Sequence, residues 1–138
     1  MVNIELAALA DYAAVTADGK LIVAGVFDSL IVAGLPASHP MMYLALRISG
    51  DAAETGRHEL EVRLVDPDGK PVIPSLKGGI ELPPTPADGT AASAQFVMGM
   101  ANVAFAAQGP HAFDILIDER YELSVSVVVR LAPPPLAE

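Results

Sequence analysis

The sequence predicts an all-β protein: a single antiparallel β-sandwich of about eight strands, with immunoglobulin-like or jelly-roll topology. Eight short apolar stretches are separated by turns rich in glycine, proline and aspartate. Several stretches alternate apolar and polar residues, which is the period of a half-buried strand. No stretch shows a convincing helical pattern, and strands at this spacing are typical of sandwiches. A closed barrel is the alternative, because strand spacing does not separate the two architectures.

The first two predicted strands form a hairpin. They cover residues 4–15 and 21–32, and the sequence Asp18-Gly19 lies between them. An Asp-Gly pair before a new apolar run is a strong hairpin signal. The alanine-rich start of the first stretch is also compatible with a helix, but a hairpin requires two extended arms. We therefore predict strands on both sides of the turn.

The middle of the chain has the clearest alternation. Prolines mark residues 34–40 as a loop, since residues before proline avoid the helical region. Predicted strands follow over residues 41–49 and 58–65, and the second of these ends at the turn Asp66-Pro67-Asp68-Gly69. The side chains that we expect to point into the core are those of Met42, Leu44, Leu46, Ile48, Leu60, Val62 and Leu64.

Four more strands complete the predicted fold. They cover residues 78–82, 92–103, 111–118 and 122–131, and a proline-rich surface loop separates the first two. The predicted β-sandwich domain therefore spans residues 1–132, and a proline-rich C-terminal tail spans residues 133–138. The inward-facing side chains expected here are Phe96, Met98, Met100, Phe113, Ile115, Ile117, Leu123, Val125, Val127, Val129 and Leu131.

The net charge and the lack of cysteine indicate which partners and which cellular compartment to expect. Seventeen acidic residues against eight basic ones give a formal net charge of −9. Phosphate backbones and anionic lipid surfaces attract proteins of the opposite charge, so we expect no nucleic-acid partner and no membrane partner. The chain has no cysteine, which rules out disulfides and thiolate metal sites and agrees with a reducing compartment. We expect a cytoplasmic protein.

Several short motifs occur in a characteristic order along the chain. Together they resemble a family of short, uncharacterised bacterial proteins that is classed as a domain of unknown function. The resemblance covers most of the chain and implies a bacterial or phage-related origin but no established activity, so it assigns no functional residue. The motifs that carry it are Ala10-Asp11-Tyr12-Ala13, Gly19-Lys20-Leu21, Gly25-Val26-Phe27-Asp28, His39-Pro40 and Leu64-Val65-Asp66-Pro67-Asp68-Gly69.

The residues that could support catalysis or metal binding are scattered. His39, His58 and His111 are far apart in the sequence, and we interpret them as three unrelated surface residues rather than metal ligands. Asp11 and Asp28 lie in apolar runs, and with a histidine they could form a hydrolase site, but nothing fixes their separation. No serine lies in a nucleophile motif. We therefore expect no enzyme, no metal and no cofactor.

A small-ligand or carbohydrate site is the first alternative to a protein-binding role. Tyr43 and Arg47 fall on the same face of a predicted strand and could line a shallow site. The chain has no tryptophan and only three tyrosines, whereas sugar-binding sandwiches use exposed aromatic rings. We therefore favour a protein–protein interface over a ligand-binding site.

An unusual excess of apolar residues favours association. Apolar residues make up 52% of the chain and charged residues only 18%, against about 25% charged in typical domains. The stretches over residues 21–27 and 97–103 are apolar on both faces, so either other parts of the chain or a partner must cover their outer faces. We predict a non-enzymatic protein-binding or self-assembly module, most simply a homo-oligomer. Its predicted interface residues are Ile22, Ala24, Val26, Val97, Gly99 and Ala101.

Overall fold

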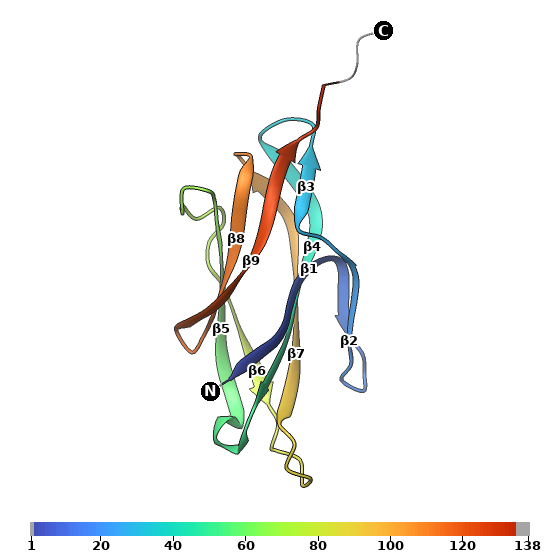
Figure 1. The fold of residues 1–138 in the computed structure, drawn as a ribbon, viewed down its shortest axis with the longest axis vertical. Helices are drawn as coiled ribbons and strands as arrows, with labels where there is room; N and C mark the ends of the chain where they lie inside the picture. The colour runs from blue at the N-terminus through green and yellow to red at the C-terminus, as the bar shows by residue number, and fades with distance from the viewer. Residues whose placement is uncertain (1, 135–138) are drawn as a thin grey trace.

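The computed structural model describes residues 2–134 and confirms an all-β fold. Two sheets, mostly antiparallel, face each other in a sandwich-like arrangement (Figure 1). Within the described residues the only helix is a single 3-10 turn at Ala52–Glu54. No helix in this part of the chain has the length and apolar character that a membrane crossing requires.

Sheet A contains four antiparallel strands in the order β2-β1-β4-β7. The first strand, β1, divides its pairing between two neighbours. Its residues 3–10 pair with β4, and its residues 10–15 pair with β2. The strands of this sheet are β1 (Asn3–Val15), β2 (Leu21–Val26), β4 (Ala37–Gly50) and β7 (Ala92–Phe105).

Sheet B contains five strands in the order β3-β9-β8-β5-β6. Its edge strand β3 runs parallel to β9, and all the other pairs are antiparallel. The strands of this sheet are β3 (Ser29–Val32), β5 (Gly56–Val65), β6 (Leu76–Leu82), β8 (Gly109–Ile117) and β9 (Arg120–Leu131).

Residues 2–134 form nine strands rather than eight, because the predicted strand over residues 21–32 is divided between the two sheets. The amide of Phe27 still donates to the carbonyl of Leu9 in sheet A at 3.0 Å. One residue later, the carbonyl of Asp28 accepts from the amide of Val128 in sheet B at 2.9 Å. The crossing lies just after Gly25, whose φ of 71° interrupts the regular strand. The expectation of a single, wholly antiparallel second strand was therefore wrong.

Two prolines that fall just outside the predicted strands lie inside strands of the structure. Pro110 is the second residue of β8, a position at a strand start where a missing amide proton is tolerated. Pro40 lies within β4, opposite Asn102 of β7, which has a positive φ of 53°. The ladder is locally irregular there, so proline fits, and β4 begins before the predicted strand and includes most of the predicted loop.

Both predicted aspartate-glycine turns are confirmed. In the first, the amide of Thr16 donates to the carbonyl of Lys20 at 2.8 Å, and the amide of Gly19 donates to Thr16 at 3.0 Å. In the second, Asp66 and Lys70 make the equivalent bond at 2.8 Å. The glycine of each turn has a φ above 80°, which explains why glycine is required there.

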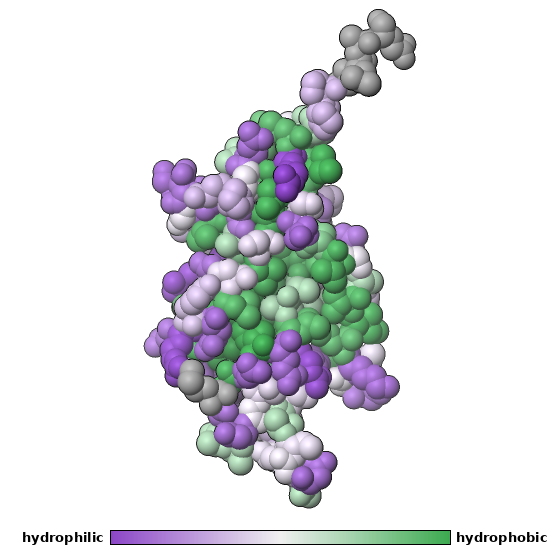
Figure 2. All heavy atoms as spheres, in the orientation of Figure 1, coloured by the Kyte–Doolittle hydropathy of each residue, from purple (hydrophilic) through white to green (hydrophobic). Residues whose placement is uncertain are grey.

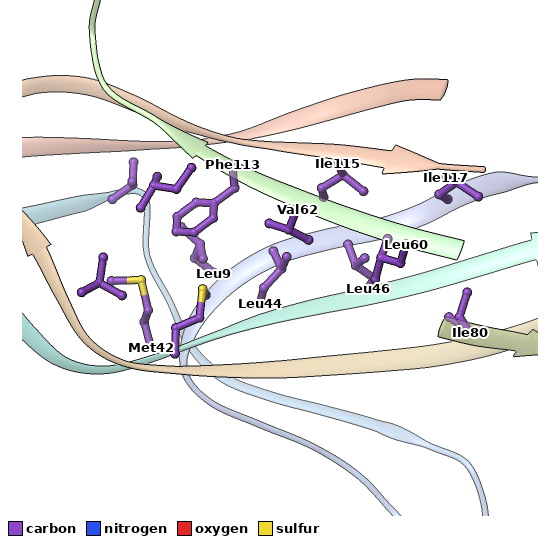
Figure 3. Packing of buried hydrophobic residues seen from close by; sticks show 14 of the residues in the cluster. Leu9, Met42, Leu44, Leu46, Leu60, Val62, Ile80, Phe113, Ile115 and Ile117 are labelled. Atoms are coloured by element: carbon purple, nitrogen blue, oxygen red, sulfur yellow. The ribbon is translucent and has the colours of Figure 1, made fainter. Parts of the chain in front are cut away.

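The core lies between the two sheets (Figure 3). Every predicted inward-facing side chain of β4, β5 and β8 is at most 3% exposed, which confirms the alternation in these strands. The prediction was wrong for Leu131, which is 43% exposed at the end of β9. Of the predicted C-terminal tail, residues 135–138 lie outside the described residues.

Candidate interaction site

The β1–β2 hairpin is a two-stranded extension of sheet A. Beyond Ala10, β1 pairs only with β2 within the described residues, and β2 has no other neighbouring strand. Figure 3 shows these two strands leaving sheet A on the side away from the labelled core residues. The hairpin register places six apolar residues on one face: Ala10, Tyr12, Ala14, Ile22, Ala24 and Val26.

Four of these residues are solvent-exposed, and we call them the hairpin face: Tyr12, Ile22, Ala24 and Val26. The exposed fractions of Tyr12, Ile22 and Val26 are 51%, 44% and 66%. Six of the nine large exposed hydrophobic residues in the described chain belong to β1, β2 and β4. Figure 2 shows hydrophobic surface gathered where Figure 1 draws β1 and β2. The second-strand residues predicted for the interface are therefore accessible.

The β7 part of the predicted interface lies at the opposite edge of sheet A, with β1 and β4 in between. Val97 is half-buried, whereas Gly99 and Ala101 are exposed. A Cβ added at Gly99 would lie 2.7 Å from Cε of Met41 and 3.1 Å from Cε1 of Tyr43. These two β4 side chains therefore lie over Gly99, so a partner at this edge would contact β4 as well as β7.

The side chains of Tyr43 and Arg47 each have a neighbour. The ring of Tyr43 meets the ring of Tyr12 edge to face, with centroids 5.6 Å apart. Nε of Arg47 donates to Oε2 of Glu5 at 2.8 Å, and both side chains are about 40% exposed. Tyr43 therefore borders the hairpin face, and sequence reasoning missed its partner Tyr12 because the two residues belong to different strand pairs.

Asp11 and Asp28 lie in different surroundings. Asp28 lines a groove of about 460 Å³ between β1 and β9, whose apolar wall includes Ile4 and Leu123. Asp11 is not among the residues that line this groove. It lies beside Gly25, where an added Cβ would approach Oδ2 of Asp11 to 2.7 Å. The structure therefore does not bring the two carboxylates into one site.

The three histidines also differ from one another. His111 is only 2% exposed, so its assignment to the surface was wrong. Its ring packs edge-on against Phe105, and Nδ1 lies 3.0 Å from the carbonyl oxygen of Gly109, which satisfies one ring nitrogen in the core. His39 is half-buried beside Phe27. Within residues 2–134, no three histidine, aspartate or glutamate side chains form a group that could hold a metal ion.

His58 bridges two turns through both of its ring nitrogens. Nε2 lies 2.6 Å from the carbonyl oxygen of Glu54, and Nδ1 lies 2.6 Å from Oδ2 of Asp118. Both neighbours accept hydrogen bonds, so only the doubly protonated ring satisfies both. The Glu54 carbonyl and the Asp118 carboxylate accordingly raise the pKa of His58. Partial burial acts against ionisation of Asp118, but hydrogen bonds from His58 and from the Glu59 amide outweigh it and lower the pKa of Asp118.

A model of a family of unknown function (DUF6941) matches residues 5–130. The chain belongs to this family. The match confirms the kind of family expected from the sequence, while the bacterial origin stays a prediction. No curated protein matches the chain.

Among solved structures, one similar chain is the Pseudomonas fluorescens alkylpurine DNA glycosylase AlkC bound to DNA containing an abasic site analog. It shares 9% sequence identity with a TM-score of 0.48, over 94% of this chain and 30% of that chain. The present chain thus spans about a third of that protein's length, and the similarity carries no information about DNA binding here.

Proposed function

We propose that this family member is a non-enzymatic self-assembly module whose copies associate through the hairpin face. The observation that carries the proposal is the exposure of Tyr12, Ile22 and Val26 on a hairpin whose outer strand, β2, pairs within the described residues with β1 alone. A two-stranded hairpin is marginally stable alone, and apolar side chains exposed together mark interaction sites. A second copy supplies the missing cover.

The energetics favour a contact of this kind. Covering the exposed parts of Ile22 and Val26 contributes on the order of 1 kcal/mol each, and the ring of Tyr12 adds further apolar area. Between Ala10 and Val26, the two hairpin strands carry one charged residue, Asp11. The other charged residues of this stretch lie in the turn. Few charges therefore need to be desolvated when the strands are covered.

We also assign the fold to the immunoglobulin-like rather than the jelly-roll class. The order β9-β8-β5-β6 in sheet B corresponds to strands G, F, C and C′ of a variable-type immunoglobulin domain, and the adjacent pair β4-β7 corresponds to strands B and E. On this assignment β1, which pairs antiparallel with β4, corresponds to strand A beside strand B. Strand β2 is then an addition at the outer edge of strand A, which fits a role in assembly.

A pair of matched variants tests the proposed function. Ile22→Asp places a charge on the hairpin face, whereas Ile31→Asp makes the same change at a residue of β3 that is 71% exposed and lies in the other sheet. We expect Ile22→Asp to shift the protein to a lower mass on a sizing column and Ile31→Asp to leave the mass unchanged. Equal behaviour of the two variants would contradict the assignment of the face. Circular dichroism checks that both variants keep the β-sheet.

A further inference from the structure

The backbone of β2 presents unpaired hydrogen-bonding groups at the edge of sheet A. The amide of Thr16 donates to the carbonyl of Lys20, so these two residues form a hydrogen-bonded pair of the β1–β2 ladder. Such pairs alternate with non-hydrogen-bonded pairs along an antiparallel ladder. Counting from the pair at Lys20, every second residue of β2 belongs to a hydrogen-bonded pair. The backbone groups of Ile22 and Ala24 therefore bond to β1. The N–H and C=O groups of Leu21 and Val23 therefore point away from β1, toward the open edge.

This edge lacks the features that normally prevent strands from pairing between molecules. Native edges carry charged residues, prolines or bulges that discourage a further strand. The sequence of β2, Leu21–Val26, contains no charged residue and no proline. By contrast β6, at the edge of sheet B, carries Lys77 and Glu81.

The opposite edge of sheet A is less open. Strand β7 lies beside β6, where a Cβ added at Gly78 would approach the ring of Phe96 to 3.3 Å. Asn102, with its positive φ, also interrupts β7. The open edge of sheet A is therefore β2, which is regular from Leu21 to Ala24, before the positive φ of Gly25.

We propose that β2 of one copy pairs antiparallel with β2 of a second copy, joining the two four-stranded sheets into one sheet of eight strands. This proposal rests on the self-association proposed above and adds to it a backbone contact at the strand edge, where Ile22 and Ala24 of the hairpin face meet across the two strands. The strand edge of a second copy is the natural complement, because a two-fold axis brings the same unpaired donors and acceptors face to face.

The pairing has a defined register. Because the N–H and C=O groups of Val23 face the open edge, a two-fold axis at this residue places Val23 opposite Val23 of the second copy. Ile22 then lies opposite Ala24 of the second copy, and Leu21 lies opposite Gly25. All five residues are uncharged, so no like charges meet across the axis. The same register continues the apolar hairpin face from one copy into the next.

Amide hydrogen exchange, measured by NMR at low and high protein concentration, tests this geometry. The amides of Ile22 and Ala24 bond to β1 and serve as internal controls that are protected at both concentrations. We expect the amides of Leu21 and Val23 to exchange quickly in dilute protein and on the order of tenfold more slowly when it associates. Rapid exchange at Leu21 and Val23 in the associated protein would overturn the edge pairing while leaving association through the hairpin face intact.

A backbone variant provides a second, independent test. Val23→Pro removes the amide proton that faces the open edge without removing a bond to β1, and proline is tolerated at such edge positions. We expect the variant to keep its circular dichroism spectrum and to lose association. Undiminished association of Val23→Pro would refute pairing through β2, and a monomeric wild-type protein would refute both this proposal and the proposed function.

Discussion

The rings of Tyr12 and Tyr43 meet edge to face, with centroids 5.6 Å apart and an angle of 65° between their planes. Tyr12 belongs to the half of β1 that pairs with β2, whereas Tyr43 lies in β4. The contact therefore connects the hairpin to the body of sheet A, next to the surface proposed to bind a second copy. Aromatic pairs of this geometry contribute about 0.5–1.5 kcal/mol beyond the burial of their area.

Removing the Tyr12 ring should loosen the hairpin. We expect Tyr12→Ala to lower the free energy of unfolding by about 1 kcal/mol, because the contact with Tyr43 is lost. Chemical denaturation measures this change. Tyr121→Ala is the control, since Tyr121 is also exposed, at 61%, and its hydroxyl bonds to the nearby hydroxyl of Ser124. An equal loss in the two variants would show that the Tyr12 ring contact contributes nothing specific.

Gly25 should resist substitution. Its φ of 71° lies in the left-handed region, and a Cβ would approach Asp11 Oδ2 to 2.7 Å. We expect Gly25→Ala to lower the free energy of unfolding by about 1–2 kcal/mol, the cost of a left-handed conformation for a residue with a side chain. Thermal or chemical denaturation tests this expectation.

Gly34→Ala is the matched control for the substitution at Gly25. Gly34 has no neighbour within 4 Å of an added Cβ and no positive φ. We expect this variant to be neutral or slightly stabilising, because alanine restricts the unfolded chain more than glycine does. If both alanine variants behaved alike, the conformation assigned to Gly25 would be wrong.

The histidine bridge should make stability depend on pH. The folded protein raises the pKa of His58, so the protonated ring stabilises the fold fully below its ordinary pKa of about 6.5. This contribution is lost as the pH rises from that value through the raised folded pKa. We expect the wild-type protein to lose stability relative to His58→Gln across this interval. Denaturation of both proteins at a series of pH values measures the difference between their free energies of unfolding. Taking this difference removes the contributions of the other titrating groups, which the two proteins share. A constant difference across the series would contradict the bridge.

The sequence predicted those parts of the fold where side chains alternate. Met42 to Ile48 and Leu60 to Leu64 have one apolar and one polar face, so the buried side follows directly from the period of a strand. Residues 21–32 have no such alternation, and periodicity therefore gave no sign of the crossing at Phe27 and Asp28. The parallel pairing of β3 with β9 depends on that crossing, and the sequence did not reveal it.

The candidate site was predicted in part for similar reasons. Ile22, Ala24 and Val26 were selected from the sequence because apolar residues on both faces of a strand require two covers, and the structure leaves all three exposed. Tyr12 and Met41 were missed because their exposure depends on where β1 leaves β4. The burial of His111 was missed because it depends on Phe105 and on the carbonyl of Gly109, which the fold places beside the ring.

The solution mass of the wild-type protein, measured by light scattering on a sizing column over a range of concentrations, tests the central claim most directly. Association through the β1–β2 hairpin predicts a mass that rises with concentration from 14.3 kDa toward twice that value. A mass that stays at 14.3 kDa at every concentration would contradict it.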